Sequence, residues 1–171
     1  RNGGSIYYIN LSQDDFKLGG SSFAQTLNKV GTEAPTIKDA SFFKKAFNTI
    51  QDLIKDRQIV AGHDIGSGGL ITTLLEMCFA DVNLGAKISF NAFKEKDLVK
   101  ILFAENIGIV LQAKDDAIFE KAFEGMEIFK IGEVIEGSLL EISTSTALSV
   151  TSFDIKQYRE MWFETSFLLD Q

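Results

Sequence analysis

The chain has 171 residues, of which 45% are hydrophobic and 24% charged, and this length and apolar content are enough for one sizeable core. With one proline and a moderate charge content, the composition excludes an intrinsically disordered chain and a collagen-like or proline-rich architecture. The net charge of −7, with acidic residues scattered along the chain, argues against a surface that neutralises many phosphates of DNA or RNA, so no nucleic-acid partner is expected.

The first part of the chain combines a predicted strand, a glycine turn and two predicted helices. Residues 5–11 are β-branched and aromatic, which is typical of a strand. The turn at Gly19 and Gly20 leads through a serine N-cap into a short helix that ends near residue 28. Over residues 39–55, apolar side chains recur at spacings of three and four, which predicts an amphipathic helix.

A second strand and helix are predicted on either side of a glycine-rich loop. The run QIVAG at residues 58–62 is typical of a short buried strand, and the apolar run at residues 70–80 is typical of a helix. The loop HDIGSGGL joins the two, and a further strand is predicted at residues 86–90. This order brings the loop to the end of a strand, where ligand sites are common.

Helices and strands continue to alternate through the second half of the chain. The pattern predicts a helix at residues 95–105, a strand at 107–112 and a helix at 115–123. Two closely spaced strands follow at residues 127–133 and 138–143, with a short glycine turn between them.

A last helix is predicted to open at a capping box formed by Asp154 and Gln157. Its apolar residues are Ile155, Tyr158, Trp162 and Phe167.

The order of these elements predicts an α/β fold, or α+β in some schemes, with a mixed sheet. Strands separated by helices favour parallel pairing, and closely spaced strands favour antiparallel pairing. We therefore expect a layered sandwich in one domain that spans residues 1–171. The early part of the chain has no GxGxxG after a strand, which argues against a dinucleotide-binding fold.

Cysteine and hydropathy patterns bear on the setting of the protein. One cysteine and one histidine exclude an internal disulfide and a Cys/His zinc cluster. Because no run of about 18 apolar residues is present and the N-terminus lacks the zones of a secretion signal, we expect no membrane partner and a cytoplasmic location. The start at Arg1 rather than at methionine indicates a piece of a longer protein.

Cys78 and the phenylalanines are interpreted as packing residues. Cys78 lies in the apolar run LLEMCFA, where no second histidine could activate its thiol. The 15 phenylalanines, many of them at helical spacing, indicate a core or a domain interface.

The loop HDIGSGGL is the most concentrated functional signal in the chain. Asp64 offers hard carboxylate oxygens suited to Mg²⁺, next to His63, and Gly66, Gly68 and Gly69 allow the backbone to approach a phosphate at a helix N-terminus. The residues alone leave two alternatives open: a ligand site, or a tight strand-to-helix connection in which Asp64 caps the helix. A lone histidine at a strand end is more often a structural residue, so His63 is the weaker candidate.

Four segments carry a family resemblance. In chain order they are LGGSSFAQ, AGHDIGSGGLITTLLEMCFA, LFAENIGIVLQ and YREMWFETSF. Together they resemble the C-terminal AIR-synthase-related domain of the large, glutamine-dependent phosphoribosylformylglycinamidine synthases. The resemblance implies a three-layer α/β/α sandwich with a mixed sheet. It also implies two partners in the same chain, an N-terminal AIR-synthase-related half-domain and a glutaminase domain.

The same resemblance implies part of an ATP-dependent ligase of de novo purine biosynthesis. In that family, formylglycinamide ribonucleotide, ATP and glutamine give the amidine, ADP, phosphate and glutamate. ATP activates the formamide oxygen as a phosphoryl ester, and ammonia from the glutaminase domain displaces the phosphate. The residues for these steps lie in the partner domains, so the resemblance implies no catalytic residue in this chain and an inactive isolated fragment.

The family loop usually reads HDxSDGGL, so HDIGSGGL departs from it at two positions. Asp64 matches the aspartate that helps to hold Mg²⁺ at a nucleotide, which implies ATP or ADP and Mg²⁺ as cofactors. Gly66 stands where a nucleotide-contacting serine is common, and Ser67 replaces an aspartate. A backbone contact at Gly66 can persist, whereas a hydroxyl contact cannot. The second half of such synthases is thought to hold its nucleotide structurally.

Two alternative functions follow from these observations. The first is a related enzyme of the same superfamily, such as aminoimidazole ribonucleotide synthetase, thiamine-monophosphate kinase or selenophosphate synthetase. The final WFETSF stretch argues against these enzymes, because it resembles the junction to a glutaminase domain. The second is a non-catalytic half-domain that binds a nucleotide structurally or has lost the ligand, which the departures at Gly66 and Ser67 permit.

Overall fold

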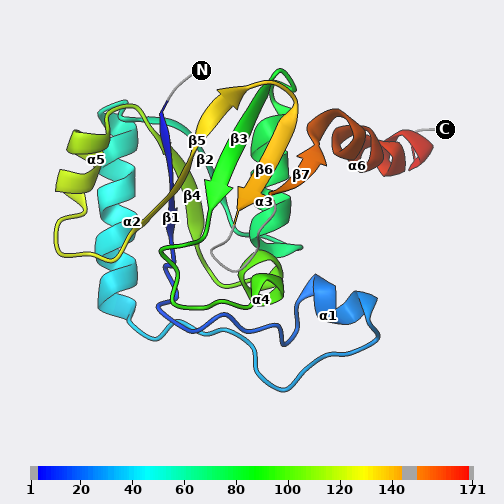
Figure 1. The fold of residues 1–171 in the computed structure, drawn as a ribbon. Helices are drawn as coiled ribbons and strands as arrows, with labels where there is room; N and C mark the ends of the chain where they lie inside the picture. The colour runs from blue at the N-terminus through cyan, green and yellow to red at the C-terminus, as the bar shows by residue number, and fades with distance from the viewer. Residues whose placement is uncertain (1–3, 144–149, 170–171) are drawn as a thin grey trace.

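The computed structural model describes residues 4–143 and 150–169, with side chains as far as residue 164. Its strands are β1 (Ser5–Ile9), β2 (Ile59–Asp64), β3 (Leu84–Ser89), β4 (Ile109–Ala113), β5 (Phe129–Glu136), β6 (Leu139–Ser143) and β7 (Thr151–Asp154). Its helices are α1 (Ser22–Thr26), α2 (Ala40–Lys55), α3 (Gly69–Phe79), α4 (Leu98–Phe103), α5 (Asp116–Ala122) and α6 (Ile155–Leu169). The strands form a seven-stranded sheet in the order β2-β4-β1-β5-β3-β6-β7 (Figure 1).

Helices cover both faces of this sheet. α2 and α5 lie on one face, and α3, α4 and α6 lie on the other (Figure 1). Successive side chains of a strand point to opposite faces, so Tyr7 and Ile9 of β1 enter the core under α2 and α5, while Ile6 and Tyr8 enter the core under α3. The predicted three-layer α/β/α sandwich with a mixed sheet is therefore confirmed.

Aspartate side chains open four of the six described helices. Asp39, Asp97 and Asp115 each accept hydrogen bonds from backbone N–H groups two or three residues further along the chain. Asp154 does the same at the start of α6, which confirms the aspartate half of the predicted capping box. Phe167, predicted to belong to this helix, lies outside the described side chains. None of the described helices is both long and apolar enough to cross a membrane.

Helix α4 is shorter than the predicted helix over residues 95–105. Asp97 caps a helix that begins at Leu98, and Ala104 ends it with an extended backbone of φ −70° and ψ 135°. Glu105 therefore belongs to the loop between α4 and β4, where its side chain can reach other loops.

Strand pairing differs from the expectation. The strands that are separated by helices pair antiparallel, as β1 with β4, β2 with β4, and β3 with β5. Parallel pairing occurs, among the described strands, between β3 and β6. β5 and β6 were expected to pair as neighbours, but β3 lies between them, and β6 pairs instead with β7, a strand that the sequence did not predict.

Glycines explain how β3 fits between β5 and β6. A Cβ atom on Gly132 of β5 would overlap the carbonyl oxygen of Lys87 in β3, and one on Gly85 of β3 would overlap the carbonyl oxygen of Leu139. The turn between β5 and β6 is also hydrogen-bonded to the residue just before β3, because the Gly137 N–H donates to the Asn83 carbonyl at 2.8 Å. Small residues thus allow close backbone approach where the strand order departs from the chain order.

Replacement of Gly132 by alanine tests this close approach. Gly132→Ala is expected to lower the free energy of unfolding by about 1 to 3 kcal/mol, the usual range for overpacking, because the backbones of β3 and β5 must separate. Urea unfolding of the chain measures the change. Gly66→Ala is the matched control, since a Cβ there meets no atom within 4 Å. Equal unfolding midpoints for the two variants would contradict the packing argument.

Candidate functional site

The glycine-rich loop follows β2, which is the edge strand of the sheet. β2 extends to Asp64, which pairs with Ile109 of β4, so His63 and Asp64 lie within the strand rather than after its end at residue 62 as predicted. The predicted order of strand, glycine-rich loop and helix is present. Gly68 and Gly69 have φ values of +89° and +74°, in the left-handed region that favours glycine, and α3 begins at Gly69.

Asp64 presents its carboxylate to solvent. The side chain is 85% exposed, and its carboxylate lies 3.5 Å from Nδ1 of His63. The alternative that Asp64 caps the helix is wrong, because the N-cap of α3 is Gly68 and receives no side-chain cap. Within the described side chains, no three His, Cys, Asp or Glu residues come together as a metal site. Asp64 can therefore supply one Mg²⁺ ligand, which fits an ion whose other ligands are water and phosphate oxygens.

The backbone of the loop offers two N–H groups next to that carboxylate. In the part of the chain that the structure describes, the N–H groups of Gly66 and Ser67 donate to no protein acceptor. In contrast, the Gly68 N–H donates to the Glu105 carboxylate at 2.8 Å, and the Gly69 N–H donates to the Gly66 carbonyl at 3.1 Å. Gly66 and Ser67 are both exposed. An anion could thus approach the loop at these two residues.

His63 is held in place through both of its ring nitrogens. Nδ1 lies 2.7 Å from the Asp64 carbonyl oxygen, and Nε2 lies 3.3 Å from the Glu76 carboxylate on α3. The same carboxylate accepts a hydrogen bond of 3.1 Å from the Trp162 indole of α6. These contacts fit the structural interpretation of His63 better than a contact with a nucleotide, which stays an untested prediction.

Glu105 joins two glycine-containing segments, a contact that the sequence analysis missed. Its Oε1 accepts the N–H of Ser22 and the N–H of Gly68, both at 2.8 Å. Partial burial acts to raise the pKa of this carboxyl, but the hydrogen bonds from Ser22 and Gly68 outweigh it, and the pKa lies below its ordinary value. Glu105 occurs in the LFAENIG segment, whose sequence gives no local signal of these distant partners.

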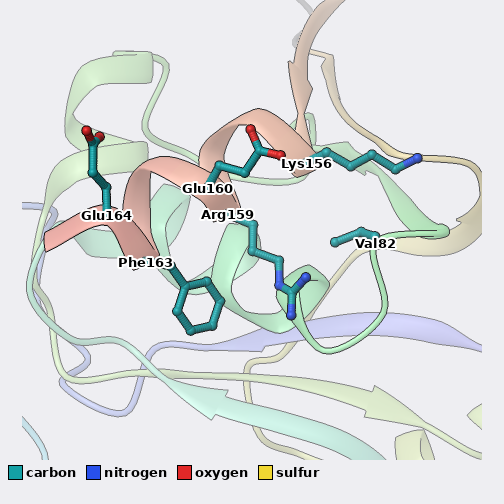
Figure 2. A pocket seen from close by; sticks show the side chains of 6 residues that line it. All are labelled: Val82, Lys156, Arg159, Glu160, Phe163 and Glu164. Atoms are coloured by element: carbon teal, nitrogen blue, oxygen red, sulfur yellow. The ribbon is translucent and has the colours of Figure 1, made fainter. Parts of the chain in front are cut away.

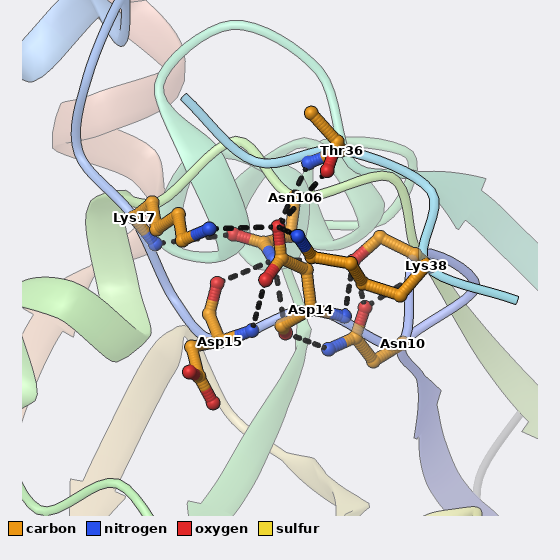
Figure 3. Close-up of polar contacts among 8 residues, drawn as sticks. Asn10, Asp14, Asp15, Lys17, Thr36, Lys38 and Asn106 are labelled. Atoms are coloured by element: carbon orange, nitrogen blue, oxygen red, sulfur yellow. Dashed lines mark hydrogen bonds and ion pairs between the residues drawn. The ribbon is translucent and has the colours of Figure 1, made fainter. Parts of the chain in front are cut away.

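A buried polar network fixes the backbone next to this contact (Figure 3). The Asn106 amide donates to the carbonyl oxygens of Asp14 and Asp15, at 3.3 and 3.0 Å. The Asp14 carboxylate accepts the Thr36 N–H and the Lys17 ammonium, each at 3.0 Å. Burial acts to raise the pKa of Asp14, but these hydrogen bonds lower it to about 2. The network ties the segment before the Gly19–Gly20 turn to the loop that carries Glu105.

Other features of the described surface lie apart from the glycine-rich loop. A pocket of 480 Å³ lies against α6, with the Arg159 guanidinium 5.1 Å from the centre of the Phe163 ring (Figure 2). None of its lining residues belongs to the loop. Burial raises the pKa of the Cys78 thiol to about 11, so the thiol stays protonated and its interpretation as a packing residue is supported.

Fold and loop together define a class of protein: a three-layer α/β/α domain with a polar, glycine-rich loop at the end of its edge strand. The chain belongs to the family described as AIR synthase related protein, C-terminal domain, whose model matches residues 2–144. This match confirms the resemblance carried by the four sequence segments.

Individual relatives agree with this assignment. The chain is 37% identical, over 98% of its length, to a probable phosphoribosylformylglycinamidine synthase, chloroplastic/mitochondrial, of Arabidopsis thaliana. It is 31% identical, over 98% of its length, to the phosphoribosylformylglycinamidine synthase of Homo sapiens. It spans 12% and 13% of the length of these two proteins.

A solved structure shares the fold. Thermotoga maritima PurL complexed with ATP matches with a TM-score of 0.63 over 91% of this chain and 25% of that chain, at 17% sequence identity. At this low identity, the likeness bears on the fold and not on the residues of the site.

The buried Asp14 carboxylate should make stability depend on pH. Its pKa of about 2 lies below the ordinary 3.8, so its contribution is present above about pH 4 and is lost as the pH falls through 2. Asp14→Asn is expected to lower the free energy of unfolding by about 2 kcal/mol at pH 7, and the difference from wild type should shrink towards pH 2. Urea unfolding at several pH values measures both quantities.

Asp52→Asn is the matched control for this experiment. Asp52 is 70% exposed and pairs with Lys55 at 3.0 Å on the surface of α2, so its loss should change stability little at any pH. Equal losses for Asp14→Asn and Asp52→Asn at pH 7 would contradict the role of the buried network.

Proposed function

We propose that the chain is one domain of a phosphoribosylformylglycinamidine synthase, an ATP-dependent ligase of purine biosynthesis that uses glutamine as its amide donor. The support is identity of 37% and 31% to two such synthases over 98% of this chain. Because the chain spans 12% and 13% of their lengths, the residues for most of the reaction belong to other parts of the protein. A reducing compartment such as the cytoplasm is compatible with a chain of one cysteine.

Two partners in the same protein are part of this proposal: an N-terminal AIR-synthase-related half-domain and a glutaminase domain. Partly exposed apolar side chains on α6 support contact with another domain, since Met161, Trp162 and Phe163 are 57%, 50% and 46% exposed.

The glycine-rich loop is the proposed site for ATP or ADP with Mg²⁺. One observation carries this assignment: an exposed Asp64 carboxylate stands directly before a turn whose Gly66 and Ser67 N–H groups have no described protein acceptor. Asp64 would provide one ligand to Mg²⁺, which would neutralise phosphate charge at the loop. The Gly66 N–H would donate to a phosphate oxygen near the N-terminus of α3, where the helix dipole favours an anion.

A structural rather than a catalytic role is proposed for this nucleotide. Ser67 replaces a residue type that could supply a second carboxylate, and Asp64 has no cluster of metal-ligating side chains around it in the described part of the chain. The nucleotide would then stabilise the folded protein by mass action, because it binds the folded state alone.

Asp64→Asn tests the metal-ligand assignment in the full-length enzyme. The substitution keeps the shape of the side chain but removes its charge, so MgADP binding should weaken roughly tenfold to a hundredfold. Stability without nucleotide should stay unchanged, because the Asp64 side chain does not cap α3. The measurement is a titration with MgADP, together with thermal melts with and without it. Asp56→Asn is the control, an exposed aspartate at the C-cap of α2, shortly before β2 begins.

A shift in melting temperature that is the same with and without MgADP would exclude Asp64 as a metal ligand. Unchanged MgADP affinity in Asp64→Asn would exclude it as well.

The isolated chain is expected to have no synthase activity. The physical reason is that one domain supplies one side of a cleft whose remaining residues lie elsewhere. The measurement is product formation from formylglycinamide ribonucleotide, ATP and ammonia, with the full-length enzyme as the positive control. Turnover by the isolated chain above a protein-free blank would refute the prediction.

A further inference from the structure

Glu105 connects two segments that are far apart in the sequence and both next to the proposed nucleotide site. Ser22 and Gly68 lie 83 and 37 residues away along the chain, yet both donate to the same carboxylate oxygen at 2.8 Å. Ser22 follows the Gly19–Gly20 turn, and Gly68 ends the turn that contains Gly66. One charged oxygen therefore sets the distance between the two turns.

The surroundings of Glu105 give this contact a rigid support. A Cβ on Gly69 would lie 2.6 Å from the Leu102 carbonyl oxygen, so the start of α3 rests against the end of α4. The rings of Phe23 and Phe103 stack with their centres 4.7 Å apart, which brings α1 to the same place. On the other side of Glu105, the buried amide of Asn106 is fixed by its hydrogen bonds to the Asp14 and Asp15 carbonyls.

Some N–H groups of the glycine-rich loop are bonded by the protein and others are not, and this difference indicates the role of the Glu105 contact. Glu105 takes the Gly68 N–H, whereas the Gly66 and Ser67 N–H groups have no described protein acceptor. The carboxylate thus holds the end of the turn and leaves its exposed part to a ligand. Hydrogen bonds to a charged acceptor are stronger and more directional than neutral ones, which suits a group that must fix a flexible glycine backbone.

We infer that Glu105 is a positioning residue for nucleotide binding, which clamps the glycine-rich loop against the Gly19–Gly20 turn and so fixes the Gly66 and Ser67 N–H groups for phosphate. This inference rests on the proposed function of the loop. The contrary possibility is that Glu105 competes with phosphate for the same helix N-terminus, because both are anions. The two cases predict opposite changes in affinity.

The experiment measures MgADP affinity in the full-length enzyme by isothermal titration. Glu105→Ala removes the acceptor and should weaken binding about tenfold or more, and Glu105→Gln, which keeps a neutral acceptor oxygen, should recover most of that loss. Ser22→Pro removes the N–H and the hydroxyl of Ser22 but leaves the Gly68 contact, and should give a smaller loss. Proline suits this position, because Ser22 is the first residue of α1 and Ser21 before it is extended at φ −67° and ψ 154°.

Glu95→Gln is the matched control. The Glu95 carboxylate also accepts two backbone N–H groups, those of Lys96 and Asp97 at 2.8 and 2.9 Å, but both belong to the turn before α4. Its substitution should leave MgADP affinity unchanged. Thermal melts without nucleotide accompany each titration, so that a loss of stability is separated from a loss of binding.

Unchanged MgADP affinity in Glu105→Ala with a lowered melting temperature would show a purely structural role and overturn the inference. Tighter binding would show competition with phosphate and overturn it too. If Glu105→Ala does not fold, Glu105→Gln and Ser22→Pro decide: unchanged affinity in both overturns the inference.

Asp64→Asn, titrated in parallel, separates the inference from the proposed function. If Asp64→Asn weakens binding and the variants at Glu105 and Ser22 do not, the inference alone fails. If neither Asp64→Asn nor the variants at Glu105 and Ser22 alter MgADP binding, both the inference and the proposed nucleotide site at the loop are wrong.

Discussion

The burial of β1 on both faces is the constraint on which the layered structure depends. Each of its five residues is buried, between β4 and β5. On one face, the Tyr7 ring stacks on Phe119 of α5 at 4.4 Å, and its hydroxyl donates to Glu120 at 2.8 Å. On the other face, Tyr8 lies 5.5 Å from the Phe93 ring. Fully burying each such side chain contributes about 1.5 to 3 kcal/mol to the free energy of unfolding. The contribution of this short strand is therefore large compared with the small net stability of a domain.

The register of the sheet fixes the position of the glycine-rich loop relative to β1. Ile9 at the end of β1 pairs with Ile109 of β4, and Ile109 pairs on its other side with Asp64 of β2. A single row across the sheet thus runs from a fully buried residue to an exposed carboxylate. Glu105 and Asn106 lie four and three residues before Ile109, in the loop that leads into β4, and their hydrogen bonds add the second fixed point. The packing of β1 in the core therefore also helps to fix the geometry of the glycine-rich loop.

Local signals in the sequence predicted the elements well, because caps and hydrophobic periodicity act over a few residues. Asp154 precedes its helix as the predicted capping box indicated, whereas Asp39 and Asp97 were expected inside helices and instead cap helices that begin one residue later. The strand order could not be predicted, because no local sequence pattern indicates that β3 lies between β5 and β6. This order depends on close backbone contact at Gly132. For the candidate site, the sequence predicted Asp64 and Gly66, and their roles stay predictions. It missed Glu105, whose partners are 37 and 83 residues away.

The open edge of β2 has a consequence for the behaviour of the chain in solution. An edge strand is a template on which another strand can add, and proteins commonly block such edges with proline, lysine or other charged residues. β2 has the sequence IVAGHD, with Ala61 and Gly62 exposed and no charged residue before its last two positions. The negative charge of Asp64 is therefore the main electrostatic barrier to edge-to-edge addition between copies. Loss of this one charge should consequently make concentrated samples more prone to β-type aggregation.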